Sequence, residues 1–517
     1  MSVKKPIKVM IFGTHPKQFN GYSKVVYELC KELSQKKDRV QVSIFGFQNF
    51  HGNDSHRIDL PDSIDVYDAF ANENPKTSGF GINQVIDVVT LKRPDVILVY
   101  NDLLVISQVV NKLKDIKDKW FKIVLYIDQV YLSQKREYID FINIHADAGF
   151  AFTPSWKTCI VKQGLTIPCD VLEHGINTDV YYPIPKKLAR AYYNLSEDDF
   201  IVINLNRNQP RKRWDTCIKA FAHVVASHRK SESKMIKFII GTALKGAWDI
   251  LEIYARELEK RGISLQEGIK HLIIIDNPQK LTDQEVNILY NASDCGINTA
   301  DGEGVGLCSV EPAVIGIPQI VPRLGGFVDF FDDTCSIMVE PRMAYYVDNT
   351  RDMVGGEALM CDYGDFADAI ELYYADAAMR ERHGKAARKK IMKPHLWSTI
   401  AEHFVDVIEK VHTGEIQVIE VAKQVEVVST VSTVSTVPTV PTLPTVPTIT
   451  LPPLPLPTIT LPTQPTLPTQ PTLPIQPTLD IDDVIIINER QEKNDRIAQQ
   501  LLQMRAQIDA MMIAMSS

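Results

Sequence analysis

Short apolar runs alternate with amphipathic stretches along the first part of the chain. The apolar runs are rich in β-branched and aromatic residues, as expected of strands buried on both faces of a parallel sheet. They are residues 7–14, 40–47, 95–101, 121–128, 148–153 and 169–176. The stretches between them space their apolar residues as a helix does, at 23–36, 103–116 and 155–163. This alternation predicts a doubly wound sheet with right-handed crossovers.

A second series of the same kind begins near residue 200. Its expected strands are 200–208, 237–244, 271–277, 294–300 and 318–323, and its expected helices are 216–227, 250–262 and 283–292. Two similar α/β domains in tandem predict a cleft between them, and open sheets of this type bind ligands at the carboxyl ends of their strands. We expect the domains to be 1–176 and 177–394, with a hinge at 177–188 and a closing amphipathic helix at 395–413.

The chain changes character after this helix. From Val427 to Leu479 it has no charged residue, and proline recurs at every third position over much of that length. A polyproline II helix has three residues per turn, so the period predicts an extended Pro/Thr-rich linker at 427–479. A ligand for a proline-binding domain and a glycosylated stalk are the less favoured alternatives.

Beyond the linker, apolar residues recur at steps of four and three, as in the a/d seam of a coiled coil. They are Ile497, Leu501, Met504, Ile508, Met511 and Met515. The pattern predicts a short C-terminal helix within 488–517, which Asn494 would extend as a polar core position. A homo-oligomer formed through this helix is slightly favoured over docking of the helix onto the globular part.

Composition limits the classes of partner. The net charge of −8 and the pI of about 5.9 argue against nucleic acid or an anionic membrane surface as partner. No stretch approaches eighteen uninterrupted apolar residues, so we expect no membrane span and a soluble cytoplasmic protein. The eight cysteines are scattered, without a CxxC pair or a histidine at metal spacing, which favours free buried thiols over a metal site.

Candidate chemistry lies in DGEGVGLCSVEPA at 301–313, where seven residues separate Glu303 from Glu311. The turn follows a predicted strand and precedes a helix-like run, so its backbone amides and the helix dipole would suit phosphate oxygens. Glu311 could face the same cleft and accept hydrogen bonds from paired hydroxyls, as on a ribose. Taken alone, an acidic turn that complements a helix dipole is the better interpretation, and GVGLCS is only half of a dinucleotide fingerprint.

A second motif, NLNRNQPRKRWD, places Arg207 at the end of a predicted strand and Lys212 just before a helix. Two cations at this corner could bind a diphosphate and stabilise the negative charge that develops on it as a leaving group. On its own, a solvated basic turn is the better interpretation of the run RKR at 211–213.

Together, in this order, the motifs resemble those of the retaining family 4 glycosyltransferases of the GT-B superfamily (glycosyl transferases group 1). The resemblance covers roughly residues 7–412 and is strongest over 174–327, where HGINTDVYYP at 174–183 and the long segment 281–326 are similar to family signatures. It implies the α/β GT-B fold, with two Rossmann-like domains on either side of an interdomain cleft. The Pro/Thr-rich tail and the short C-terminal helix would be additions to that fold.

The resemblance also implies roles for single residues. Arg207 and Lys212 would bind the donor diphosphate, and Glu311 would bind the ribose hydroxyls. Glu303 would face the transferred sugar.

Backbone groups have implied roles as well. The amides of Gly304, Val305 and Gly306 would lie near the transferred sugar. In the first domain, NGYSKVV is similar to the family's glycine-rich loop and would place Gly21 against the phosphates. The chain has one glycine there, where the family often has two.

A further departure from the family pattern lies in the segment KIVLYIDQVY at 122–131. The family often has a histidine there, and this chain has Asp128. Asp128 could contact a sugar hydroxyl or the acceptor, or it could only cap the strand end. The presence of Asp128 in place of this histidine would affect which donor sugar binds and whether the sugar is transferred.

The activity implied is transfer of a sugar from a nucleotide sugar to a hydroxyl of a glycan or another acceptor, with retention of configuration. No DxD motif stands at the right place, so we expect no metal and no cofactor besides the nucleotide sugar, with Arg207 and Lys212 in place of the metal. Two alternatives stay open. One is a nucleotide-sugar epimerase or hydrolase, and the other is a non-catalytic sugar-nucleotide-binding scaffold with an oligomerising tail.

Overall fold

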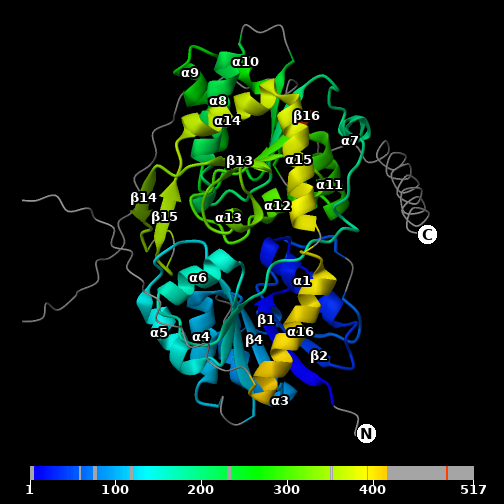
Figure 1. Ribbon diagram of the computed structural model, residues 1–517, viewed down its shortest axis with the longest axis vertical. Coiled ribbons are helices and arrows are strands. Elements are labelled where there is room, and N and C mark those ends of the chain that lie inside the picture. Colours follow the sequence, from blue (N-terminus) through cyan, green and yellow to red (C-terminus); the bar gives the residue numbers. More distant parts are fainter. Residues whose placement is uncertain are drawn as a thin grey trace, which may run out of the picture. The chain divides into compact units, whose positions relative to one another are not determined.

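The computed structural model contains two parallel sheets, each covered by helices (Figure 1). It describes residues 5–57, 60–73, 78–116, 120–229, 234–276, 278–349, 351, 353–392, 394–415 and 485–486. The expected Pro/Thr-rich linker at 427–479 lies outside the described residues. The expected C-terminal helix at 488–517 lies outside them as well.

The first sheet has seven parallel strands in the order β3-β2-β1-β4-β5-β6-β7. They are β1 (Ile7–Thr14), β2 (Val40–Phe47), β3 (Asp65–Asp68), β4 (Val96–Asp102), β5 (Lys122–Asp128), β6 (Ala148–Ala151) and β7 (Cys169–Val171). Its helical segments are α1 (Gly21–Leu33), α2 (Ala69–Asn72), η1 (Ile82–Gln84), α3 (Val85–Lys92), α4 (Leu103–Leu113), α5 (Arg136–His145) and α6 (Pro154–Lys162). The chain changes direction across the sheet between β1 and β4, which are neighbours.

The second sheet is also parallel, in the order β13-β12-β11-β8-β9-β10-β16. Its strands are β8 (Phe200–Asn204), β9 (Ile236–Gly241), β10 (Leu272–Ile275), β11 (Cys295–Ile297), β12 (Gln319–Pro322), β13 (Ser336–Val339) and β16 (Ile485–Ile486). Its helical segments are α7 (Lys186–Tyr192), η3 (Pro210–Lys212), α8 (Trp214–Ser227), α9 (Ile250–Glu259), α10 (Leu265–Ile269), η4 (Pro278–Lys280), α11 (Asp283–Ala292), α12 (Leu307–Val314), α13 (Phe327–Phe330), α14 (Tyr363–Ala375) and α15 (Ala377–Met392). The change of direction here lies between β8 and β11.

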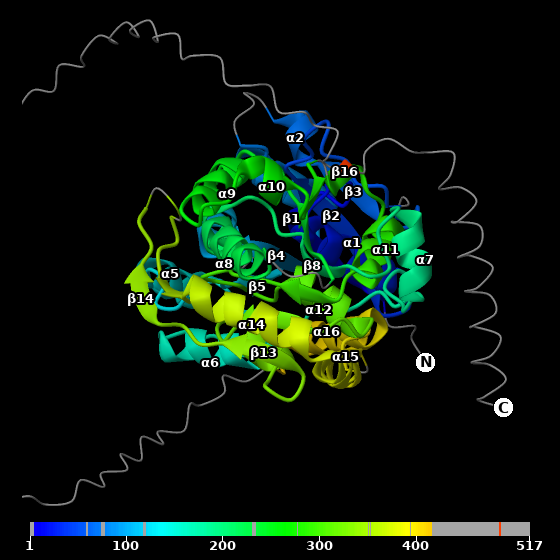
Figure 2. The same cartoon turned by 90° about the horizontal axis from the view of Figure 1, so that it is seen from above.

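Helices cover both faces of the second sheet because its strands bury side chains on both sides (Figure 2). Ile240 and Ile274 belong to a core shared with α8, α9 and α14. Ile239 and Ile273, one residue earlier on the same strands, belong to a core shared with α7 and α11. The near-continuous apolar runs in the sequence follow directly from this arrangement.

Helix α16 (Trp397–Thr413) follows α15 but packs against the elements of the first sheet, beside α1 (Figure 1). Phe404 is fully buried, with its ring centroid 5.9 Å from that of Phe150 in β6. Over the described residues up to Glu415, the chain therefore crosses between the sheets twice. The two crossing segments pair with each other, since the amide of Ile176 donates to the carbonyl of His395 at 2.6 Å.

The sequence predicts two parallel α/β sheets, and the structure confirms them, with β1 and β2 at the expected bounds. The structure differs from the expectation at polar or exposed elements. Strand β3 is a polar edge strand, and the hairpin of β14 (Met343–Tyr346) and β15 (Glu357–Met360) is largely exposed on β14. Helix α7 begins inside the expected hinge. None of the helices in the described part of the chain combines the length and apolarity needed to cross a membrane.

Candidate functional site

A cavity of about 380 Å³ lies at the carboxyl ends of both sheets. From the first sheet it is lined by the loop and helix after β1 and by the ends of β4 and β5. From the second sheet it is lined by the segments after β8, β9 and β11. In each sheet the lining segments flank the point where the strand order changes direction, which is where open α/β sheets bind ligands.

The loop between β11 and α12 carries Glu303 into this cavity. Gly306 ends the loop with a positive φ of 79°, a conformation that favours glycine, and no side chain caps the N-terminus of α12. A Cβ on Gly326 would overlap the carbonyl oxygen of Gly304, so the loop lies directly on the backbone behind it. The backbone of Gly304, Val305 and Gly306 lines the cavity.

Glu303 is buried and shared by two cations. Lys212, in η3 after β8, donates to its Oε2 atom, and Arg211 Nη1 lies 3.2 Å from its Oε1 atom. Burial alone would raise the pKa of Glu303, but the charges of Lys212 and Arg211 outweigh it and lower that pKa. Glu303 is therefore a stable carboxylate in a corner that keeps an excess of positive charge.

Arg207 lies at the same corner, in the segment that follows β8. Its carbonyl oxygen accepts a hydrogen bond from the Trp214 indole at 3.3 Å, which holds the backbone in place. Its guanidinium lines the cavity and forms no hydrogen bond or ion pair with another described residue. This side chain is available to an anionic ligand.

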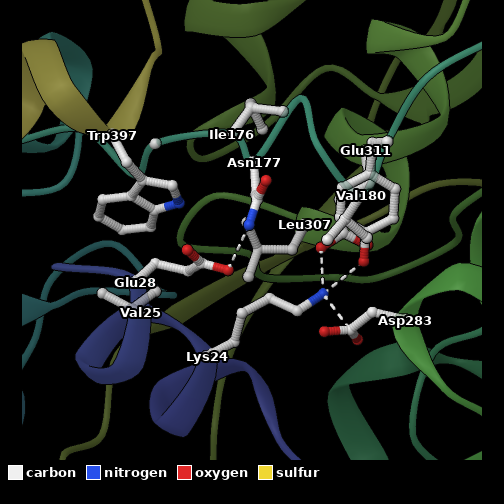
Figure 3. Close-up of a pocket in the computed structure, with 12 residues that line it drawn as sticks. Lys24, Val25, Glu28, Ile176, Asn177, Val180, Asp283, Leu307, Glu311 and Trp397 are labelled. Atoms are coloured by element: carbon white, nitrogen blue, oxygen red, sulfur yellow. Dashed lines mark hydrogen bonds and ion pairs between the residues drawn. The ribbon is translucent and has the colours of Figure 1, made fainter. Parts of the chain in front are cut away.

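Glu311, on α12, is held by donors from two other elements. Lys24 Nζ, on α1 of the first sheet, lies 2.7 Å from its Oε1 atom. The hydroxyl of Tyr290, on α11, lies 3.3 Å from its Oε2 atom. Figure 3 shows Lys24 reaching from α1 to both Glu311 and Asp283.

Asp128 ends β5 and faces the loop of Glu303 across the cavity. The Tyr22 hydroxyl donates to its Oδ2 atom, and a Cβ on Gly304 would lie only 2.7 Å from its Oδ1 atom. Burial raises the pKa of Asp128 to about 6, although the hydrogen bond from Tyr22 and the charge of Arg211 oppose the rise. The carboxyl therefore titrates close to neutral pH.

His174 is a further polar side chain at this end of the cavity. It is 4% exposed and stands among the rings of Phe152, Tyr126 and Tyr100, at centroid distances of 4.5, 5.8 and 6.3 Å. Burial lowers its pKa to about 3, so the imidazole is neutral. Neither ring nitrogen forms a hydrogen bond with the described residues. His174 thus offers a free donor and a free acceptor to whatever occupies the cavity.

The structure brings all the residues singled out from the sequence to this one cavity. They are Gly21, Asp128, Arg207, Lys212, Glu303, Gly304, Val305, Gly306 and Glu311. Sequence reasoning missed Lys24, Tyr22 and Arg211, which contact these residues directly. Arg211 could have been found, because it stands next to Lys212 in the same basic turn. Tyr22 and Lys24 lie in the segment NGYSKVV with Gly21, but nothing in that segment indicates their partners Asp128 and Glu311.

The described residues contain no group of three or more His, Cys, Asp or Glu side chains arranged to hold a metal ion. The charged groups that line the cavity near Glu303 are the three cations of the segment 207–212 and the carboxyl of Asp128.

Curated relatives match this chain over part of its length. No protein-family model matches the chain. The D-inositol 3-phosphate glycosyltransferase of Gordonia bronchialis is 25% identical over 222 residues, which are 42% of this chain and 42% of that protein. The D-inositol 3-phosphate glycosyltransferase of Mycolicibacterium smegmatis is 29% identical over 161 residues, or 30% of this chain and 32% of that protein. The chain spans less than half the length of these curated relatives.

Solved structures match over most of the chain. Sucrose-phosphate synthase from Thermosynechococcus elongatus superposes with a TM-score of 0.60 at 15% identity, covering 79% of this chain and 100% of that one. The chain has the GT-B fold. HepE of Anabaena, solved in complex with UDP-glucose, has a TM-score of 0.54 at 14% identity over 78% of this chain and 100% of that one. The resemblance to family 4 glycosyltransferases predicted from the motifs is confirmed.

Proposed function

We propose that this GT-B protein is a retaining glycosyltransferase, which moves a sugar from a nucleoside-diphosphate sugar to a hydroxyl of an acceptor. The observation that carries the proposal is the corner after β8. There, Arg207 has no partner among the described residues, while Arg211 and Lys212 share the single carboxylate Glu303. Three cations around one carboxylate leave excess positive charge, which suits a diphosphate.

The donor would lie along the second sheet. Its diphosphate would bind Arg207 and Lys212, with the uncapped N-terminus of α12 supplying backbone amides and a positive dipole. Glu311, further along α12, would accept hydrogen bonds from the ribose hydroxyls. Gly21, at the start of α1, has no side chain to obstruct the approach of the phosphates from the first sheet.

The sugar would lie between Glu303 and Asp128, which face it from the two sheets. The bond between the anomeric carbon and the phosphate oxygen breaks, and the acceptor oxygen bonds to the same face of that carbon. The acceptor proton passes to the departing phosphate oxygen. Arg207 and Lys212 stabilise the negative charge that develops on this phosphate, so the step needs no metal ion in this proposal.

The wall around His174 would keep water from the reacting carbon. Phe152, Tyr100 and Tyr126 surround this histidine, and their rings leave little room for solvent. The free nitrogens of His174 would then bind a hydroxyl of the sugar or of the acceptor. A uridine nucleotide is the first donor to test, because HepE is described in complex with UDP-glucose.

Calorimetric titration tests the donor site. Full-length protein is titrated with UDP, GDP and ADP and with their glucose conjugates, with and without a divalent metal ion. We expect saturable binding of one nucleotide without metal. Arg207→Ala should weaken that binding by about 10-fold to 100-fold, since charge-assisted hydrogen bonds to phosphate are lost.

The matched control is Arg256→Ala. Arg256 is exposed on α9, pairs only with Glu252 among the described residues and does not line the cavity, so its loss should leave the affinity unchanged. Equal affinity of wild type and Arg207→Ala would contradict the donor site. Conversion of the bound nucleotide sugar to an epimer without any acceptor would instead favour an epimerase.

A further inference from the structure

Lys24 lies on α1, which packs on the first sheet, but its side chain contacts residues that belong to the second sheet. Its ammonium lies 2.6 Å from the hydroxyl of Tyr181, 2.7 Å from Glu311 Oε1 and 3.7 Å from Asp283 Oδ1 (Figure 3). Tyr181, Asp283 and Glu311 all lie beyond the first crossing between the sheets. Lys24 is therefore a direct link from α1 to the carboxylate proposed to bind ribose.

The surroundings of Lys24 make this link specific. The side chains of Lys24, Glu311 and Asp283 are 17%, 6% and 18% exposed, so water screens them little. Burial alone would lower the pKa of Lys24, but Asp283 and Glu311 outweigh it, and the pKa is raised. One ammonium thus stands between two carboxylates that would otherwise repel each other.

The donors to Glu311 leave a defined part of its carboxylate free. An ionised carboxylate offers about four lone-pair sites, two on each oxygen. Lys24 takes one site on Oε1, Tyr290 takes one on Oε2, and the Tyr181 hydroxyl also bonds this carboxylate. The remaining acceptor capacity belongs to a residue that also lines the main cavity. The two neighbouring hydroxyls of a ribose can share it.

We infer that Lys24, together with Tyr290, is a positioning residue for nucleotide recognition, which fixes Glu311 so that it selects a ribose with both hydroxyls. The inference rests on the proposed function. Lys24 acts through Glu311 in this arrangement, and its charge also keeps Glu311 apart from Asp283. The first sheet thereby takes part in recognising the half of the donor that the second sheet binds.

Removal of the charge has a definite consequence. Lys24→Met keeps the length of the side chain but removes the cation between Glu311 and Asp283. Asp283 keeps its ion pair with Arg57 at 3.6 Å, whereas Glu311 loses its ion pair with Lys24 and keeps only hydroxyl donors among the described residues. The Glu311 carboxylate is then free to turn away from Asp283, which weakens it as an acceptor for ribose hydroxyls. Lys24→Arg keeps the charge and should retain most of the selection.

The experiment compares ribonucleotides with their 2′-deoxy forms. Dissociation constants of UDP and 2′-deoxyUDP, and of the GDP and ADP pairs, are measured by calorimetry for wild type and variants of the full chain. Wild type should prefer the ribonucleotide by about 10-fold or more, as expected for a hydrogen bond to a charged group. Lys24→Met should reduce that preference to about twofold or less. Lys24→Arg should restore it.

The matched control is Glu28→Gln. Glu28 lines the same small cavity next to Lys24 and accepts a hydrogen bond from Asn177 at 2.9 Å, but it does not contact Glu311 (Figure 3). This variant should keep the wild-type preference. If Lys24→Met does not fold, as judged by thermal unfolding, Tyr290→Phe carries the test, because it removes only a hydroxyl that donates to Glu311.

The outcomes separate the inference from the proposed function. Parallel weakening of both nucleotide forms by Lys24→Met, with an unchanged ratio, would overturn the inference and leave a general structural role. The same holds for an unchanged ratio in Tyr290→Phe. A wild-type protein that binds a nucleotide without preferring ribose would also overturn the inference while the donor site stands. A wild-type protein that binds none of the diphosphates would overturn both.

Discussion

Asp128 stands where the family pattern often has a histidine, and its environment gives it a similar titration range. Its carboxyl accepts a hydrogen bond from the hydroxyl of Tyr22 and packs against the backbone of Gly304. Burial raises its pKa from 3.8 to about 6. A carboxyl with this pKa changes charge near the pH at which a histidine does.

The raised pKa of Asp128 predicts a pH dependence of stability. Between about pH 4 and pH 6 the folded state holds a proton that the unfolded state has released, so the contribution of Asp128 to stability falls as pH rises through this window. Asp128→Asn removes the charge but not the volume. We expect this variant to be more stable than wild type at pH 7.5, by roughly 1–3 kcal/mol, and to differ little at pH 4.

Urea unfolding at both pH values measures this effect. Tyr22→Phe is the informative companion, since loss of the hydrogen bond should lower stability at pH 7.5 more than at pH 4. Equal free energies of unfolding for wild type and Asp128→Asn at pH 7.5 would show that the ionised Asp128 carboxyl does not destabilise the folded state.

At the residue scale, the sequence was informative where chemistry is local in the chain. Arg207 and Lys212 share one turn, and Glu303 and Glu311 flank one helix start, so two short motifs carried the family resemblance that placed them together. Lys24 could not be found in this way. Its partners Glu311 and Asp283 are more than 250 residues away, and a lysine on an amphipathic helix ordinarily faces solvent.

At the scale of elements, the buried helices and strands were the ones that could be predicted from the sequence. Strands β1 and β2 are nearly continuous apolar runs, and their bounds agree with expectation. Helix α15 was not predicted, because its sequence AAMRERHGKAARKKIM is largely polar and only a few of its side chains are buried. The hairpin β14–β15 gave no signal either, since its first strand is mostly exposed and pairs only with its partner strand among the described residues.

Helix α16 gives a test of how an element is held. Arg39 pairs with Glu402, Asp406 and Glu409 along its exposed side, while Phe404 is buried against the first sheet. We expect Phe404→Ala to lower the free energy of unfolding by about 3–5 kcal/mol and Arg39→Ala by less than about 1 kcal/mol. Packing, and not the ion pairs, then holds the helix.

Chemical denaturation at low and at physiological salt measures both variants. The Arg39 effect should shrink further as salt rises, because exposed ion pairs are screened. If Arg39→Ala lowers the free energy of unfolding as much as Phe404→Ala does, the ion pairs hold the helix as strongly as the packing, and the prediction is wrong.

At the scale of the whole molecule, the described fold ends at Glu415 apart from the short strand β16. A chain that stops after Glu415 keeps every residue that lines the cavity. We expect it to bind nucleotide with an affinity within about twofold of the full chain. We also expect a smaller oligomer by light scattering, since the C-terminal helix at 488–517 would be absent.

Calorimetry and light scattering on the same preparations separate these two expectations. An unchanged molecular mass per assembly would remove the predicted coiled coil from the account of oligomerisation. A large loss of nucleotide affinity would mean that the segment after Glu415 contributes to the fold that holds the site. The coiled coil and the Pro/Thr-rich linker stay predictions until then.

Backbone bridges join the two halves of the fold at Ile176 and Leu396, and again at Leu132 and Glu357. If the Leu132 bridge opens, the paired crossings at Ile176 and Leu396 become a pivot, and a body that turns about a pivot moves least beside it. Lys24 and Glu311 line the small cavity next to Gly175, Ile176 and Trp397, so they sit near the pivot. Asp128 and Gly304 line the large cavity and do not line this small one. A swing that admits the acceptor can therefore leave the ribose contacts in place, which predicts that one bound nucleotide outlasts several acceptor encounters.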